Sequence, residues 1–126
     1  VLVDAPCLGL GALRRRAESR WRKQASDLTD LVPLQKALLN NALNAIRPGG
    51  IAGYVTCSWH LAETEYVVED ILKLRREVKI LDINLGIDSI PNLKNPDDLK
   101  SPDRFLHLWP HLHNTDGMFM AILTRE

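Results

Sequence analysis

The sequence predicts an α/β fold, with a mostly parallel sheet that carries helices on its faces. Short apolar runs of β-forming residues alternate along the chain with longer segments of helical periodicity, which is typical of this class. The 126 residues suit one domain, and 45% hydrophobic residues with zero formal net charge suit a soluble globular protein. The last apolar run follows the third without a helix between them, so the last strand is expected to run antiparallel.

The first half of the chain predicts a strand, a turn and a helix. Residues 1–4 read as a buried strand that Pro6 ends. Glycines then make a flexible turn, and a helix is predicted to open at residues 30–33 and to stop at Arg47-Pro48-Gly49-Gly50. Helical spacing gives this helix one wide apolar face, formed by Leu34, Leu38, Leu39, Ala42, Leu43 and Ile46.

The second half predicts two strands around a helix, then a long loop and a final strand. Residues 51–57 and 78–83 read as buried strands, and residues 62–77 as an amphipathic helix with acids early and bases late. Its apolar line comprises Val67, Ile71, Leu74 and Val78, widened by Val68 and Leu72. Three prolines break residues 84–104, which predicts a long loop, and residues 118–124 predict the last strand.

The segment from Arg14 to Lys23 concentrates positive charge on an otherwise neutral chain. It holds six basic residues, one acid and Trp21. One interpretation is a solvated helix face with a half-buried indole. The other is a phosphate-contacting patch with a stacking platform for a base. The segment alone does not decide between them.

Two cysteines end two of the predicted strands, in Asp4-Ala5-Pro6-Cys7 and in Thr56-Cys57-Ser58. If these strands are parallel neighbours, both thiols lie at the carboxyl edge of the sheet, where open α/β sheets bind ligands. Two distant cysteines make neither a disulfide framework nor a zinc motif. Buried structural thiols remain an alternative, as does a redox pair, although the usual C-x-x-C spacing is absent.

Taken together, the motifs resemble a known family. D-A-P-C, a following G-x-G-x-x-R-R segment and tryptophan, T-C-S after a strand, and a terminal W-P-H…D-G-M-F-x-A resemble the RNA cytosine-C5 methyltransferases. The resemblance is strongest to the bacterial 16S ribosomal RNA branch (Sun/Fmu, RsmB-type), and it runs from residue 1 to about 125. The chain departs from the family pattern at Leu8, Ala17 and Thr64, where serine or threonine, proline and asparagine are common.

The resemblance implies the C-terminal half of a Rossmann-like class I methyltransferase sheet. Residues 1–4, 51–57 and 79–83 match its parallel strands four, five and six, and residues 118–124 match strand seven, antiparallel between five and six. Residues 1–126 would form part of a catalytic domain, with the N-terminal cofactor half and the RNA-binding domain absent. The first strand would then expose an edge, from which we expect self-association.

The implied reaction is transfer of a methyl group from S-adenosylmethionine to C5 of a cytosine in 16S ribosomal RNA. Cys57 would be the nucleophile that attacks C6, and Cys7 would assist product release. Asp4 would contact the N3/N4 edge of the cytosine as a protonated carboxyl, and Asp4 and Pro6 would lie beside the cofactor. Most of the cofactor site would lie upstream, so the fragment itself would be inactive. RNA phosphates would be held by the arginines of the basic segment, Arg14, Arg15, Arg20 and Arg22.

Other functions and sites are weighed beside this one. A non-catalytic RNA-binding or ribosome-associated module would need the basic segment but not both thiols. His107 and His111 have i, i+4 spacing, but Pro110 argues against a regular helix there, so no metal site is expected. Glu63 and Glu65 are most simply partners of a helix dipole. No apolar run approaches the roughly 20 residues of a membrane span, so a cytoplasmic protein without membrane contact is expected.

Overall fold

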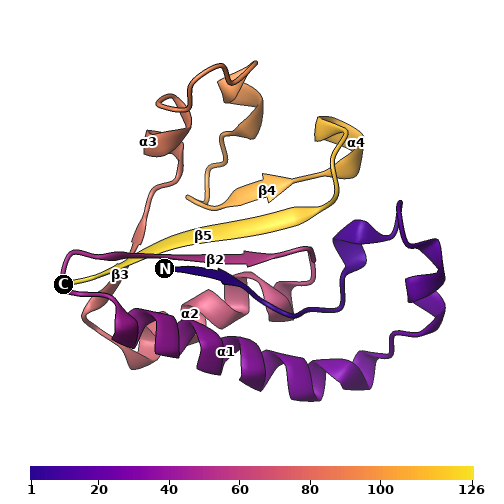
Figure 1. Ribbon diagram of the computed structural model, residues 1–126, viewed down its shortest axis with the longest axis horizontal. Helices are drawn as coiled ribbons and strands as arrows, with labels where there is room; N and C mark the ends of the chain where they lie inside the picture. The colour runs from indigo at the N-terminus through magenta and orange to yellow at the C-terminus, as the bar shows by residue number, and fades with distance from the viewer.

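The sheet is organised around its last strand. The computed structural model describes all 126 residues, and β5 (Met118–Arg125) lies in the middle of five strands (Figure 1). The other strands are β1 (Leu2–Asp4), β2 (Ile51–Thr56), β3 (Val78–Leu81) and β4 (Leu106–Leu108). Two longer helices, α1 (Leu28–Ala45) and α2 (Glu65–Leu74), cover one face of the sheet; two single-turn helices, α3 (Asn84–Ile87) and α4 (Pro110–His113), lie beyond the other (Figure 1).

The strand order is β1-β2-β5-β3, and β4 pairs with β5 beyond the end of β3. β1 and β2 are parallel, whereas β5 is antiparallel to β2 and to β3. The predicted order, with the last strand antiparallel between the second and the third, is therefore confirmed. Parallel pairing of β1 with β2 also sends both strands out at the same edge of the sheet.

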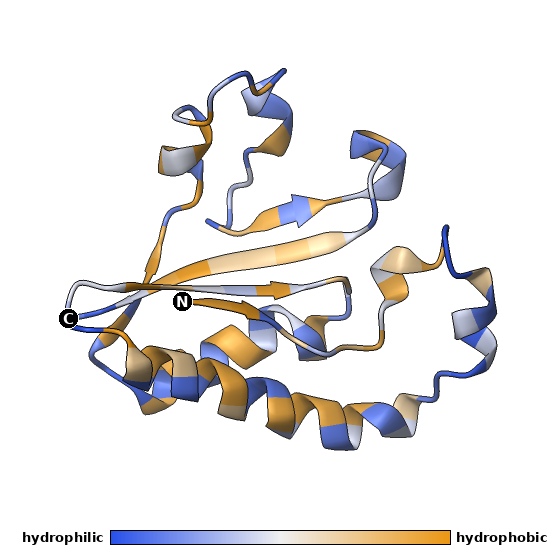
Figure 2. Ribbon diagram, in the orientation of Figure 1, coloured by the Kyte–Doolittle hydropathy of each residue, from blue (hydrophilic) through white to orange (hydrophobic).

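The main core lies between the sheet and the two longer helices. Fully buried Tyr54 and Phe119 from the sheet meet Leu39 and Leu43 of α1 and Val67 of α2. Tyr54 and Phe119 pack edge to face, with ring centroids 6.3 Å apart. Apolar and polar residues alternate along the ribbon of α1 (Figure 2), and Leu39, Ala42 and Leu43 are buried against the sheet while the opposite face stays in water.

Both helix predictions need correction at their ends. α1 begins at Leu28, two residues before the predicted opening, because Gln24 and Asp27 form a reciprocal capping box in the turn ahead of it. Leu34, assigned to its apolar face, is 46% exposed. α2 ends at Leu74, which is 79% exposed, and Val78 belongs to β3 instead.

The prediction of a long loop at residues 84–104 is wrong in part. The segment contains α3 and a 3-10 helix at Pro96–Leu99, and it leads into β4, a strand that the sequence did not predict. β4 pairs antiparallel with the first half of β5, with Leu106 opposite Met120 and Leu108 opposite Met118. Three residues are too few to show a strand pattern in the sequence, but their pairing places His107 opposite Phe119.

β1 is an edge strand whose outer side has no partner, and Leu2 is 66% exposed. Such an edge can pair with another chain. Self-association through β1 stays a prediction, which sedimentation of the chain over a range of concentrations would test. No helix has the length and apolar character that crossing a membrane requires.

Two glycines allow loops from distant parts of the chain to touch. The Gly11 N–H donates to the Cys57 carbonyl at 2.9 Å, and the Gly117 N–H donates to the Gly11 carbonyl at 2.8 Å. A Cβ atom on Gly11 would lie 1.8 Å from the Gly117 carbonyl oxygen, and one on Gly117 would lie 2.6 Å from the Trp59 ring. Only glycine fits at these contacts.

We expect Gly11→Ala to lower the free energy of unfolding by about 1–3 kcal/mol, the usual cost of forcing an extra methyl group into a packed site. Gly86→Ala is the matched control, because a Cβ there meets nothing within 4 Å. Urea unfolding of both variants measures the difference. Equal stability of the two variants would contradict the close approach at Gly11.

Candidate functional site

Two thiols meet at the carboxyl edge of the sheet. Cys7 lies three residues after β1, Cys57 follows β2 directly, and their Sγ atoms are 3.4 Å apart. Both cysteines are free and partly buried. The expectation that the thiols share one edge is confirmed, and the distance is that of a hydrogen bond between sulfur atoms.

The contact between the thiols separates their acidities. A hydrogen bond from Cys7 lowers the pKa of Cys57 to about 6, although burial and the nearby carboxylates of Asp4 and Asp116 act against this shift. The same hydrogen bond, burial and the Glu63 carboxylate raise the pKa of Cys7 above its usual range. These opposite shifts favour a thiolate at Cys57 and a thiol at Cys7. A thiolate is the nucleophilic form of cysteine.

The thiols open onto a cavity of about 430 Å³. Asp4 and Pro6, both predicted for this site, line it, as do Cys7 and Cys57. Arg16, Ser19 and Lys23 line it as well, and the sequence prediction did not single them out. Arg16 and Lys23 belong to the basic segment, but a run of charges does not show which members turn inward.

Arg14 and Arg15 are ion-paired with Asp116. Arg14 Nε lies 3.0 Å from Oδ1 of Asp116, and Arg15 Nε donates to Oδ2 at 2.7 Å. These hydrogen bonds, the one from Arg15 first, lower the pKa of Asp116, and the carboxylate in turn raises the pKa of Arg15. The arginine side chains are 43% and 59% exposed, so each ties the basic segment to the turn before β5 and keeps a surface toward solvent.

Arg20 and Arg22 are exposed members of the same segment. The Arg20 guanidinium lies 4.8 Å from the centroid of the Trp21 ring, a cation–π geometry. Trp21 is 79% exposed, so the interpretation of a half-buried indole is wrong. An exposed ring with arginines on both sides can stack on a base while its neighbours contact phosphates.

The prediction for Glu63 is also wrong. Its side chain is fully buried rather than exposed at a helix start, and it accepts a hydrogen bond from the Leu8 N–H at 2.8 Å. Glu63 ends a 3-10 helix at Leu61–Glu63, just before α2. It is thus directed at the loop that carries Cys7, which no local pattern in the sequence indicates.

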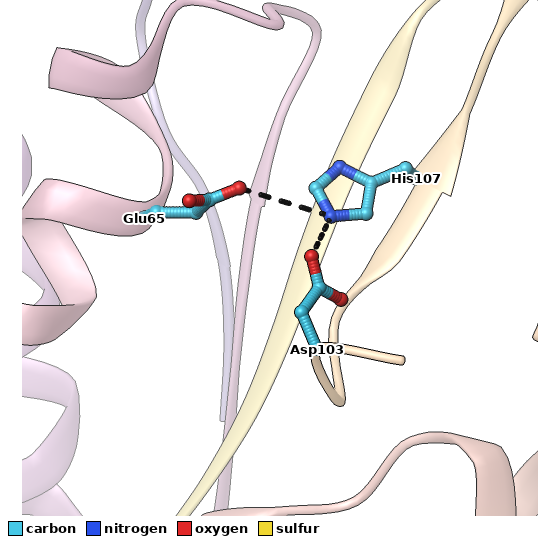
Figure 3. A group of neighbouring side chains, drawn as sticks. All are labelled: Glu65, Asp103 and His107. Atoms are coloured by element: carbon cyan, nitrogen blue, oxygen red, sulfur yellow. Dashed lines mark hydrogen bonds and ion pairs between the residues drawn. The ribbon is translucent and has the colours of Figure 1, made fainter. Parts of the chain in front are cut away.

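Glu65, Asp103 and His107 form a second polar group, on the face of the sheet that α1 and α2 cover, beside Phe119 of β5 (Figure 3). His107 Nε2 lies 2.8 Å from Asp103 Oδ2 and 4.0 Å from Glu65 Oε1. Partial burial would raise the pKa of Asp103, but hydrogen bonds from Ser101, the Phe105 N–H and His107 lower it. Because the imidazole already bonds Asp103 directly, the group reads as a clamp between β4 and the preceding segment.

Comparisons with known proteins agree with this geometry. The model of the family described as 16S rRNA methyltransferase RsmB/F matches residues 1–124. A protein of Mycobacterium tuberculosis (strain H37Rv) that is named as a methyltransferase is 46% identical over 99% of this chain and 26% of its own length. Ribosomal RNA small subunit methyltransferase F of Aeromonas salmonicida is 30% identical over the whole chain and 25% of its own length.

Solved structures resemble the chain in the same way. A methyltransferase homologue from Pyrococcus horikoshii superposes with a TM-score of 0.73 at 31% identity, over 99% of this chain and 38% of that one. NSun6 from Pyrococcus horikoshii, solved with SFG, superposes with a TM-score of 0.71 at 25% identity, over 98% of this chain and 29% of that one.

The chain spans about a quarter of the length of the curated relatives that it matches. The family match nevertheless covers almost every residue, including both cysteine motifs, the basic segment and β5. On this evidence the chain belongs to the RsmB/F family of 16S rRNA methyltransferases.

Proposed function

We propose that this chain carries the two-cysteine part of an enzyme that methylates C5 of a cytosine in 16S ribosomal RNA. The observation that carries the proposal is the pair of thiols, 3.4 Å apart on the wall of a cavity large enough for a nucleobase. Only one of the two is acidic, which suits one thiolate nucleophile and one neutral partner. Family membership supports the reaction class.

The chemistry follows from the weak nucleophilicity of C5 of cytosine. The Cys57 thiolate would attack C6, forming a C–S bond and making C5 enamine-like, so that C5 can take a methyl group. The C5 proton must then leave, and its electron pair re-forms the C5–C6 double bond as the C–S bond breaks. Cys7, held as a thiol beside Cys57, would assist this release. Asp4, exposed at the end of β1, would contact the N3/N4 edge of the base.

S-adenosylmethionine would supply the electrophilic methyl group. Asp4 and Pro6 line the cavity on its β1 side, and both are open to solvent, so they suit contact with the methyl-bearing end of the cofactor. The neighbour solved with SFG, an S-adenosylmethionine analogue, supports the use of S-adenosylmethionine. The remaining contacts would come from a part of the enzyme that precedes this chain, in which β1, β2, β5 and β3 would be strands four, five, seven and six of the class I methyltransferase sheet.

Methyl transfer from radiolabelled S-adenosylmethionine to 16S ribosomal RNA tests the proposal in the full-length protein. We expect Cys57→Ala to lower turnover by at least about a thousandfold, the scale for loss of a covalent nucleophile. Cys7→Ala should transfer about one methyl group per enzyme and then stop, because release fails. Turnover that survives Cys57→Ala but not Cys7→Ala would reverse the two roles.

The acidity of Cys57 gives a second prediction. Alkylation of Cys57 by iodoacetamide should be fast at pH 7 and should slow as the pH falls through about 6, where the thiolate is protonated. Cys7→Ala removes the hydrogen bond to that thiolate, so the midpoint should rise toward the ordinary value near 8.5, and the thiolate fraction at pH 7 should fall by up to about thirtyfold. Cys7→Ser, which keeps a donor, should fall between the two. An unchanged midpoint in Cys7→Ala would contradict the assigned hydrogen bond.

The basic segment predicts salt-dependent RNA binding. Arg20→Gln and Arg22→Gln should each weaken binding to a ribosomal RNA hairpin and lower the slope of log affinity against log salt by about 1. Arg76→Gln is the control, since it removes an exposed arginine from the turn between α2 and β3. An affinity for RNA that does not vary with salt concentration would rule out the basic segment as a surface that binds RNA phosphates. A non-catalytic RNA-binding module would show the same salt slopes but would transfer no methyl group to the RNA.

A further inference from the structure

Cys7 lies in a loop, yet the site needs its thiol in one place. The residues between β1 and the 3-10 helix at Leu10–Ala12 form neither helix nor strand. Loops of this kind move unless their backbone groups are bonded to the rest of the fold. The 3.4 Å contact with Cys57 would be lost if the loop shifted by even one or two ångströms.

The two peptide groups that flank Cys7 are held by buried side chains. Gln35 Nε2 of α1 donates to the Pro6 carbonyl at 2.8 Å. The Leu8 N–H donates to Glu63 Oε1 at 2.8 Å. The position of Cys7 is therefore fixed by hydrogen bonds to the Pro6 carbonyl before it and to the Leu8 N–H after it.

These two side chains form one network with the core. Gln35 Nε2 also donates to Glu63 Oε1 at 3.1 Å, and the Tyr54 hydroxyl donates to the Glu63 carbonyl at 2.8 Å. Gln35, Glu63 and Tyr54 are all fully buried. The network thus connects α1, β2 and the 3-10 helix at Leu61–Glu63 to the Cys7 loop.

Packing alone does not account for these residue types. A buried carboxylate and amide lose their hydration, and apolar side chains of similar size would fill the same space at lower cost. Gln35 Oε1 and Glu63 Oε2 are buried without any hydrogen-bond partner in the chain, which adds to that cost. What these side chains provide, and a leucine or methionine would not, is a fixed position for the Cys7 backbone and a carboxyl group near the Cys7 thiol.

We propose that Gln35 and Glu63 are positioning residues that hold the Cys7 thiol as hydrogen-bond donor to Cys57, so that Cys57 is the thiolate of the pair. The Glu63 carboxylate acts in the same sense, because its charge disfavours a thiolate at Cys7. Asp4, Asp116 and Arg15 also act on Cys57 through their charges, and they stay unchanged in the variants below. The proposal rests on the proposed function for its effect on catalysis, but the choice of thiolate can be measured without it.

The test is the ratio of Cys57 to Cys7 alkylation by iodoacetamide at pH 7, read by mass spectrometry after brief labelling of the full-length protein. Native protein should label Cys57 at least about tenfold faster than Cys7. Glu63→Gln keeps the size of the side chain and removes its charge, and Gln35→Met removes the hydrogen bond to the Pro6 carbonyl. Each should lower the ratio at least about fivefold, whereas the exposed matched control Glu69→Gln should leave it within about twofold.

A merely structural role would lower the unfolding midpoint and leave the ratio unchanged. Folded Glu63→Gln and Gln35→Met proteins with the native ratio would therefore overturn the proposal. If neither folds, Tyr54→Phe decides, since it keeps the ring and removes only the hydrogen bond to the Glu63 carbonyl. A drop of the ratio beyond the range of the control is expected, and a ratio within that range overturns the proposal. Methyl transfer measured alongside separates the two hypotheses: a ratio that falls as expected, in a protein that methylates no RNA, refutes the proposed function alone.

Discussion

The parallel pairing of β1 with β2 is the constraint on which the site depends. Val3 lies opposite Tyr54 and Asp4 opposite Val55, so both chains leave the sheet at the same edge. The Ala5 N–H continues the ladder by donating to the Val55 carbonyl at 2.9 Å. With the opposite strand direction the two cysteines would lie at opposite edges of the sheet, and no loop movement could bring them into contact.

β5 brings the rest of the molecule to that edge. β2 pairs with one side of β5, and β4 and then β3 pair with its other side. The turn before β5 places Asp116 and Gly117 beside the basic segment. Asp116 binds two arginines, and Gly117 bonds Gly11, which bonds the Cys57 carbonyl. The loop after Cys7 is thus bonded to Cys57 through Gly11. The turn at Gly117, more than a hundred residues downstream, is bonded to the same loop.

The sequence predicted what rests on local pattern, and it missed what rests on distant contacts. The strands at both cysteines follow from apolar runs and from the residues that stop them. The resemblance of the motifs supplied the antiparallel position of β5. The burial of Glu63 was missed because Glu-Thr-Glu before a helix reads as an exposed first turn, while its partner Leu8 lies 55 residues away. The inward turn of Arg16 and Lys23 depends on 3-10 turns that charge alone does not encode.

The central proposal is that Cys57 forms the covalent bond to the target base. The most direct measurement incubates the full-length protein with S-adenosylmethionine and 16S ribosomal RNA that contains 5-fluorocytidine, whose fluorine cannot leave C5 as a proton does. Mass spectrometry of the digested protein then locates the trapped RNA. We expect an adduct on Cys57 and none on Cys7. An adduct on Cys7, or methyl transfer without an adduct on either cysteine, would contradict it.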